Sequence, residues 1–143
     1  VLYTGYNLAA TLASVPAGRL ADRRGPRASL ALGVALFLLA YLGFAVAAGG
    51  AVLGAAFVLA GAGIGCVETA EHAAVARLAP PPVRGSAFGV LGAAQSLGNL
   101  VASGVTGLLW TVLAPGTAFL WPAGWMAASL ALLAAGGRWS TAP

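Results

Sequence analysis

Three long stretches of this chain contain no charged side chain: residues 1–18, 28–67 and 85–137. A helix needs about 20 apolar residues to cross the hydrocarbon core of a bilayer. The first stretch is therefore long enough for one slightly truncated span, and each of the others is long enough for two. Only 7% of the 143 residues are charged, whereas soluble domains carry roughly a quarter. The sequence predicts a polytopic membrane protein.

The spans are expected to be helical, because backbone polar groups in lipid must find their hydrogen-bond partners within the segment. Prolines and glycine pairs punctuate the apolar stretches and set the expected helix ends. We predict an all-α transmembrane bundle that forms a single domain over residues 1–143. Its five spans are expected at about residues 1–17, 28–48, 51–78, 86–113 and 117–135.

The basic residues are all arginines, and their placement predicts the orientation of the chain. Four lie between the first two expected spans, two lie between the third and fourth, and Arg138 follows the fifth. The turns near Gly49 and Pro115 carry no charge, so every arginine falls on one side of the membrane. The positive-inside rule makes that side cytoplasmic. We expect the N-terminus of the chain outside and its C-terminus inside, in a membrane of the bacterial inner type. Basic residues confined to short connections do not indicate a nucleic-acid partner.

The first arginine group lies in the segment Gly-Arg-Leu-Ala-Asp-Arg-Arg-Gly-Pro-Arg, residues 18–27. It resembles the signature cytoplasmic loop of the major facilitator superfamily, which reads Gly-x-Leu-small-Asp-Arg-x-Gly-x-Arg/Lys. The matching residues are Gly18, Leu20, Ala21, Asp22, Arg23, Gly25 and Arg27. Arg24 stands where an aromatic residue is common, and Pro26 stands where a basic residue is common. We expect Gly25 to permit a tight turn. We expect Asp22 either to pair with one of the four arginines or to cap a helix N-terminus.

A second segment, residues 77–89, is similar to the connection between the fourth and fifth helices of a facilitator half. It contains a proline-rich turn followed by Arg84 and Gly85. The resemblance implies helices eight to twelve of a twelve-helix transporter, that is, five of the six helices of the C-terminal half. It further implies a secondary transporter of a small molecule, an N-terminal half of the same chain as partner, no cofactor and no catalytic residue.

The third expected helix carries three ionisable residues within a span, Glu68, Glu71 and His72. Such residues are costly in lipid and are functional candidates. In one interpretation Glu68 or Glu71 takes up and releases a proton, with His72 tuning or relaying it. In the other, the acids pair with Arg23, Arg27 or Arg77 and latch the cytoplasmic face. Arg77 and Arg84 complete this candidate charge cluster. Gly61 and Gly65 continue the face of Glu68 and His72 as a GxxxG-like packing stripe.

This helix also comes close to two other sequence motifs. Residues 68–72 come close to an inverted zinc-peptidase motif, but a glutamate stands where the first histidine is needed, so no metal site is predicted. The glycines of residues 61–65 follow no strand, so no dinucleotide cofactor is predicted. A membrane-embedded enzyme using Glu68, Glu71 and His72 would need further acid, histidine or cysteine groups at the same depth in neighbouring helices, and the chain has none there. A non-transporting scaffold of the same fold stays open.

Polar residues form a stripe on each of two otherwise apolar helices. Those of the first helix are Tyr3, Asn7, Thr11 and Ser14, and those of the fourth are Gln95, Ser96, Asn99, Ser103 and Thr106. Each stripe occupies one side of its helix, which favours faces that line a water-filled cavity. We assign that role to Asn7, Thr11, Gln95, Asn99 and Ser103. The alternative is hydrogen bonding between helices, or, for serine and threonine, to the backbone of their own helix.

Overall fold

The computed structural model describes residues 1–136, which form five α-helices and one short 3-10 turn. Their bounds are α1 Leu2–Arg24, α2 Pro26–Val46, α3 Gly50–Leu78, the 3-10 turn η1 Pro81–Val83, α4 Arg84–Val112 and α5 Pro115–Ala135. Residues 137–143, including the predicted cytoplasmic Arg138, lie outside the described part of the chain. The prediction of an all-α bundle is confirmed.

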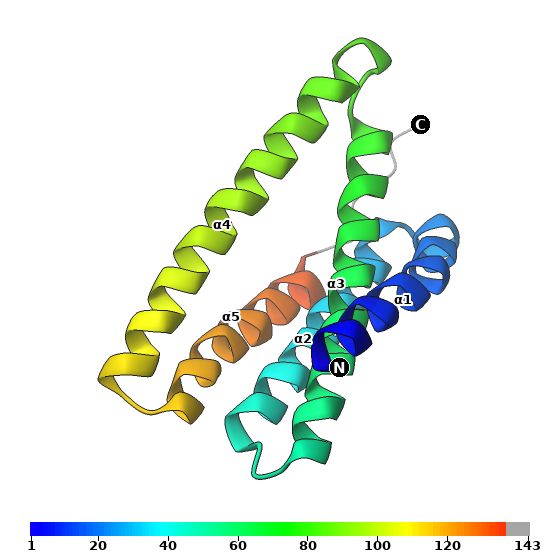
Figure 1. Ribbon diagram of the computed structural model, residues 1–143. Coiled ribbons are helices and arrows are strands. Elements are labelled where there is room, and N and C mark those ends of the chain that lie inside the picture. The colour runs from blue at the N-terminus through cyan, green and yellow to red at the C-terminus, as the bar shows by residue number, and fades with distance from the viewer. Residues whose placement is uncertain (137–143) are drawn as a thin grey trace.

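Helix α3 is the centre of the arrangement, with α1 and α2 packed along it and α5 packed against α2 (Figure 1). Helix α4 diverges from this group, so that a wide angle separates it from α3 over most of its length (Figure 1). The α1–α2 and α3–α4 connections lie toward one end of the molecule, and the α2–α3 and α4–α5 connections lie toward the other (Figure 1). The described arginines lie in the helix ends that flank the α1–α2 and α3–α4 connections.

Glycines bring α3 into close contact with both of its neighbours. A Cβ atom placed on Gly61 would collide with the backbone of Tyr6, and one placed on Gly65 would collide with the backbone of Ala10, both on α1. On the α2 side, a Cβ on Gly33 would lie 2.9 Å from the carbonyl oxygen of Gly63. Small residues permit such close helix packing in membranes. The predicted packing stripe of Gly61 and Gly65 is confirmed, and α1 is the helix that it packs against.

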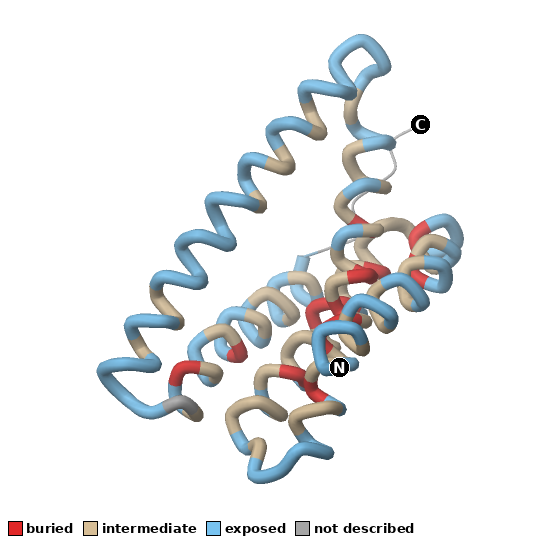
Figure 2. Tube along the Cα trace, in the orientation of Figure 1, coloured by how far each residue is buried: buried red, intermediate tan, exposed pale blue. Residues whose placement is uncertain are grey.

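The buried residues are small and the exposed ones are large, which is the reverse of a soluble bundle. Apart from Val34 and Cys66, every buried hydrophobic residue is alanine. Leu132, Val90 and Leu100 are exposed over 70% or more of their surface. Figure 2 shows most of the buried positions where α1 and α2 pack on α3, with two more on α5, whereas α4 has no buried position. A surface of this kind suits lipid contact, because lipid tails solvate large apolar side chains.

Four helices are long and apolar enough to cross a membrane: α2, α3, α4 and α5. Helix α1 is not among them, because its polar stripe and its basic C-terminal turn lower its hydropathy. That residues 1–17 form a membrane span, the first of the five expected, therefore stays a prediction. The expected end of that helix near Pro16 is wrong, since α1 continues through Pro16 to Arg24. A proline inside a membrane helix is tolerated when neighbouring groups satisfy the freed carbonyl.

Candidate functional site

The signature segment is mostly helix rather than loop. Its residues up to Arg24 form the last turns of α1, and only Gly25, with φ of 86°, interrupts the helix before α2 begins at Pro26. A positive φ suits glycine, and proline is favoured at a first helical position. The tight turn predicted at Gly25 is therefore confirmed. A Cβ placed on Gly18 would make only an ordinary contact with Thr69 of α3. Leu20 is half-buried and Arg23 is exposed.

Asp22 forms an ion pair with Arg77 of α3, at 4.0 Å between Oδ1 and Nη2. The same nitrogen donates a hydrogen bond of 3.1 Å to the carbonyl oxygen of Ala21. Ala21 lies in the last turn of α1, where carbonyls lack helical partners and attract cations. The expectation that Asp22 pairs with a neighbouring arginine or caps α2 is therefore wrong. Its partner lies 55 positions away, and Gly25 is the N-cap of α2.

Arg27 connects the signature segment to the far end of the chain. Its Nη2 donates hydrogen bonds to the carbonyl oxygens of Leu133 and Gly136, at the C-terminus of α5. A guanidinium there satisfies orphan carbonyls and opposes the negative end of the helix dipole. Arg77 and Arg27 thus each donate hydrogen bonds to carbonyl oxygens at the C-terminal end of a neighbouring helix, Arg77 to α1 and Arg27 to α5.

Glu71 forms the contact between α3 and α4. Its Oε2 accepts a hydrogen bond of 2.5 Å from Nε2 of Gln95. Glu71 is half-buried, whereas Glu68, one turn earlier, is exposed. The structure therefore places Gln95 beside Glu71 and pairs Arg77 with Asp22, in place of the expected pairing of Arg77 with an acid of α3. Arg84 is exposed at the first position of α4.

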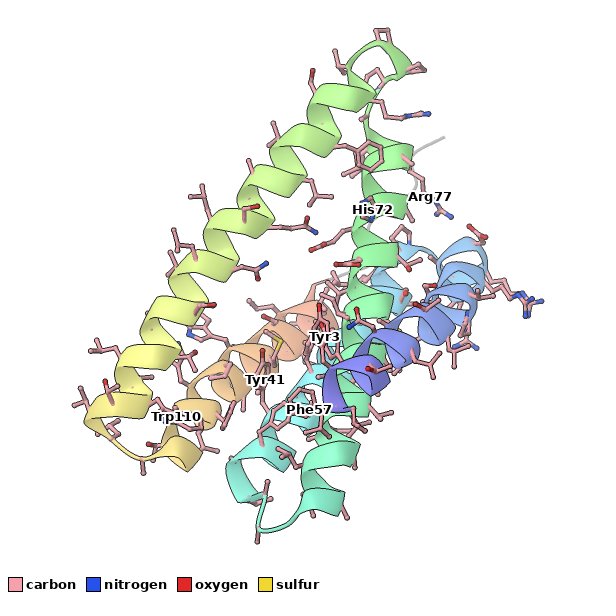
Figure 3. All side chains as sticks on the ribbon, in the orientation of Figure 1. Tyr3, Tyr41, Phe57, His72, Arg77 and Trp110 are labelled. Atoms are coloured by element: carbon pink, nitrogen blue, oxygen red, sulfur yellow. The ribbon has the colours of Figure 1, made fainter. Side chains whose placement is uncertain are left out.

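His72 lies beside this contact and faces α4. Its Nδ1 is 2.7 Å from the carbonyl oxygen of Glu68, so this nitrogen carries a proton. Its ring stacks on Phe88 of α4 with centroids 5.5 Å apart. Figure 3 shows His72 and Arg77 on the same part of α3, and their partners lie on opposite neighbours, α4 and α1. Within residues 1–136, His, Cys, Asp and Glu form no group of three that is able to hold a metal ion.

A groove of about 470 Å³ runs between α4 and the α2–α5 pair. Asn99, Ser103 and Thr106 of the α4 stripe line one wall together with Trp110 of the same helix, and Tyr41 of α2 and Pro122 of α5 line the others. Figure 3 labels Tyr41 and Trp110 at this part of the structure. Sequence reasoning missed Tyr41 and Trp110. The sequence does contain one indication that Tyr41 has a role. Tyr41 and Ser29 are the only polar side chains within the uncharged residues 28–48.

The polar residues of α1 bond to their own helix. Asn7 donates to the carbonyl oxygen of Tyr3 at 2.8 Å, and Thr11 donates to that of Asn7 at 2.9 Å. Ser14 bonds to Thr11 in the same way. These bonds match the local alternative and leave the cavity-lining role of Asn7 and Thr11 as a prediction.

These features together define an integral membrane protein built as a helical bundle, with its described arginines beside the α1–α2 and α3–α4 connections and a partly polar groove beside α4. The sequence profile of the Major Facilitator Superfamily matches residues 1–142. The chain belongs to this superfamily of membrane transporters, as its signature segment indicates.

One relative is the uncharacterized MFS-type transporter Rv1250 of Mycobacterium tuberculosis, which is 35% identical over 98 residues. The match covers 68% of this chain and 17% of the relative. The chain thus corresponds to a small part of that protein's length. No solved structure matches this chain.

Proposed function

We propose that this chain is part of the C-terminal half of a secondary active transporter that moves a small solute by alternating access, coupled to protons or another ion. The main support for the proposal is the groove beside α4, which polar side chains line in part, together with the Glu71 carboxylate, whose hydrogen bond connects α3 and α4. Polar and ionisable groups in a membrane bundle mark substrate and ion pathways. Asn99, Ser103 and Tyr41 supply hydrogen-bonding groups for a solute, and Glu71 supplies a group that can exchange a proton.

The proposal requires a second half, because transporters of this type bind their substrate between two repeats that move against each other. The relative supports this, since the match covers only 17% of its length. In our proposal the N-terminal half faces the groove side of the bundle. The arginine-bearing end lies in the cytoplasm, the N-terminus of the chain lies outside, and the membrane is of the bacterial inner type.

Flux in proteoliposomes tests the proposed function. The full polypeptide should accumulate at least one solute of a panel of uncharged and charged small molecules when a proton gradient is imposed. The isolated 143 residues should give no flux, because they lack a second wall for the pathway. A folded full polypeptide that gives neither accumulation nor exchange with any solute would support the scaffold instead. Flux by the isolated chain would overturn the two-half mechanism.

The contacts of Arg77 predict a local stabilisation of the signature segment. Arg77→Gln should lose the ion pair with Asp22 and weaken the bond to Ala21. The ion pair is largely exposed and contributes little, and the hydrogen bond contributes about 1 kcal/mol. Hydrogen exchange in the last turn of α1 should therefore accelerate by about threefold to tenfold. Arg84→Gln, which removes an exposed arginine from the same end, is the matched control. Equal exchange in both variants would remove this role from Arg77.

A further inference from the structure

Within residues 1–136, the side-chain hydrogen bond and ring contact between α3 and α4 lie toward the end at which the two helices are connected. The contacts there are the hydrogen bond between Glu71 and Gln95 and the stacking of His72 on Phe88. At its other end α4 is attached to α5, where the rings of Trp110 and Phe119 meet at 5.6 Å between centroids. The polar groove lies alongside α4 between these two attachments. A change at the α3–α4 contact therefore changes how far this end of the groove opens.

The two acids of α3 differ in what their carboxylates can do. The carboxylate of Glu71 accepts a hydrogen bond from another helix, whereas Glu68 is exposed and contributes its backbone carbonyl to His72. A proton on Glu71 therefore alters an interhelical contact. The carboxylate of Glu68 has no such contact among the hydrogen bonds within residues 1–136.

We propose that Glu71, and not Glu68, is the proton-responsive residue of this bundle, and that Gln95 is its positioning partner. Ionised Glu71 holds α4 against α3 through the Gln95 amide. When a carboxylate oxygen takes a proton from water, the charge is lost and the contact weakens. This inference rests on the proposed function for its role in transport, and it identifies the acid through which a proton gradient would act.

The strength of the contact depends on charge. A hydrogen bond to an ionised carboxylate is roughly twice as strong as one between neutral groups. The net contribution of a hydrogen bond to protein stability is larger when one partner is charged. The difference corresponds to roughly a tenfold change in the ratio of molecules with the α3–α4 contact formed to molecules with it broken. The bond joins an amide N–H to a carboxylate oxygen, so its strength depends on whether that carboxylate is ionised. Protonation should therefore shift α4 away from α3 without a change in the rest of the bundle.

Other titratable or charged groups surround α3 and must be separated from Glu71. They are Glu68, His72 and Arg77 on α3, Arg84 on α4, Arg27 and Tyr41 on α2, and Tyr6, Arg19, Asp22, Arg23 and Arg24 on α1. Arg77 is occupied by Asp22 and Ala21 on the α1 side. His72 is the one competitor inside the α3–α4 contact, because its ring lies on Phe88.

Spin-label distances in the full polypeptide, held in lipid nanodiscs, test the proposal. Labels are attached to cysteines introduced at the exposed positions Ala76 on α3 and Ala93 on α4. Cys66 and all other cysteines are replaced beforehand. Between alkaline and acidic buffer, the closed population should fall by roughly tenfold relative to the open one. Because no substrate is needed, the result is independent of whether transport is found.

The variants decide which group titrates. Glu71→Gln should abolish the pH response, whereas the matched variant Glu68→Gln should retain it. Gln95→Leu should give the open distance at every pH, and it also serves if Glu71→Gln does not fold. His72→Asn should retain the response. A response that survives Glu71→Gln, or one that is lost in Glu68→Gln or His72→Asn, would overturn the proposal. So would a distance that is independent of pH in the unsubstituted protein.

Discussion

Adding one methyl group at Gly61 and one at Gly65 should strongly destabilise the folded protein. A Cβ on Gly61 would lie 3.0 Å from the Cα atom of Tyr6 and closer still to its carbonyl group. The new methyl at Gly65 would meet the backbone of Ala10 in the same way. Because the clashes are with backbone atoms, a change of side-chain rotamer cannot relieve them, and α1 must move away from α3. Overpacking costs about 1–3 kcal/mol at each site, and the double variant should lose a large part of a typical stability.

Gly98→Ala is the matched control, since it makes the same chemical change on α4. Apart from its chain neighbours and the backbone of its own helix, no described atom lies within 4 Å of a Cβ built at Gly98. Alanine is favoured over glycine in a helix by about 1 kcal/mol, so this variant should be neutral or more stable. The measurement is the folded fraction after detergent extraction, followed by thermal unfolding. Equal stability of the Gly61→Ala, Gly65→Ala and Gly98→Ala variants would show that α1 does not pack on α3 through these glycines.

The helices were predictable from the sequence because their signals are local. Uncharged stretches, proline runs and glycine pairs lie within the segments that they delimit, and the stripe of Gly61 and Gly65 follows from one helical period. The end of α1 was missed because Pro16 was read as a terminator, whereas the interruption comes at Gly25. What Pro16 does depends on its neighbours in three dimensions, which its sequence position does not specify.

The pairings of the charged residues were less predictable, because they join distant segments. Asp22 and Arg77 are 55 positions apart, and Arg27 reaches residues more than a hundred positions away. Several arginines are expected near one membrane surface, and all offer Asp22 a partner of similar chemistry, so sequence spacing alone does not identify the partner.

The groove was hard to predict for the same reason, because it too is formed by segments that are distant in the sequence. Its walls come from α2, α4 and α5, and only the stripe on α4 was visible as a sequence period.

Cysteines at Asn99 and Ser103 should react rapidly with a membrane-impermeant thiol reagent, whereas a cysteine at Leu100 should not. All three positions lie within about one helical turn of α4, so they share a depth in the membrane. Asn99 and Ser103 line the groove, while Leu100 is exposed over 70% of its surface and belongs to the lipid-facing side.

Rates should differ by at least about tenfold, because the reactive thiolate forms poorly in apolar surroundings. The measurement uses the full polypeptide in membranes, with Cys66 replaced by alanine so that the buried native thiol contributes no signal. A solute that protects the cysteines at Asn99 and Ser103 from the reagent would place the transport pathway in this groove. Slow reaction at all three positions would mean instead that the polar stripe of α4 bonds to another helix. In that case the pathway would have to be sought on the α1 side of the bundle, where Asn7 and Thr11 are exposed.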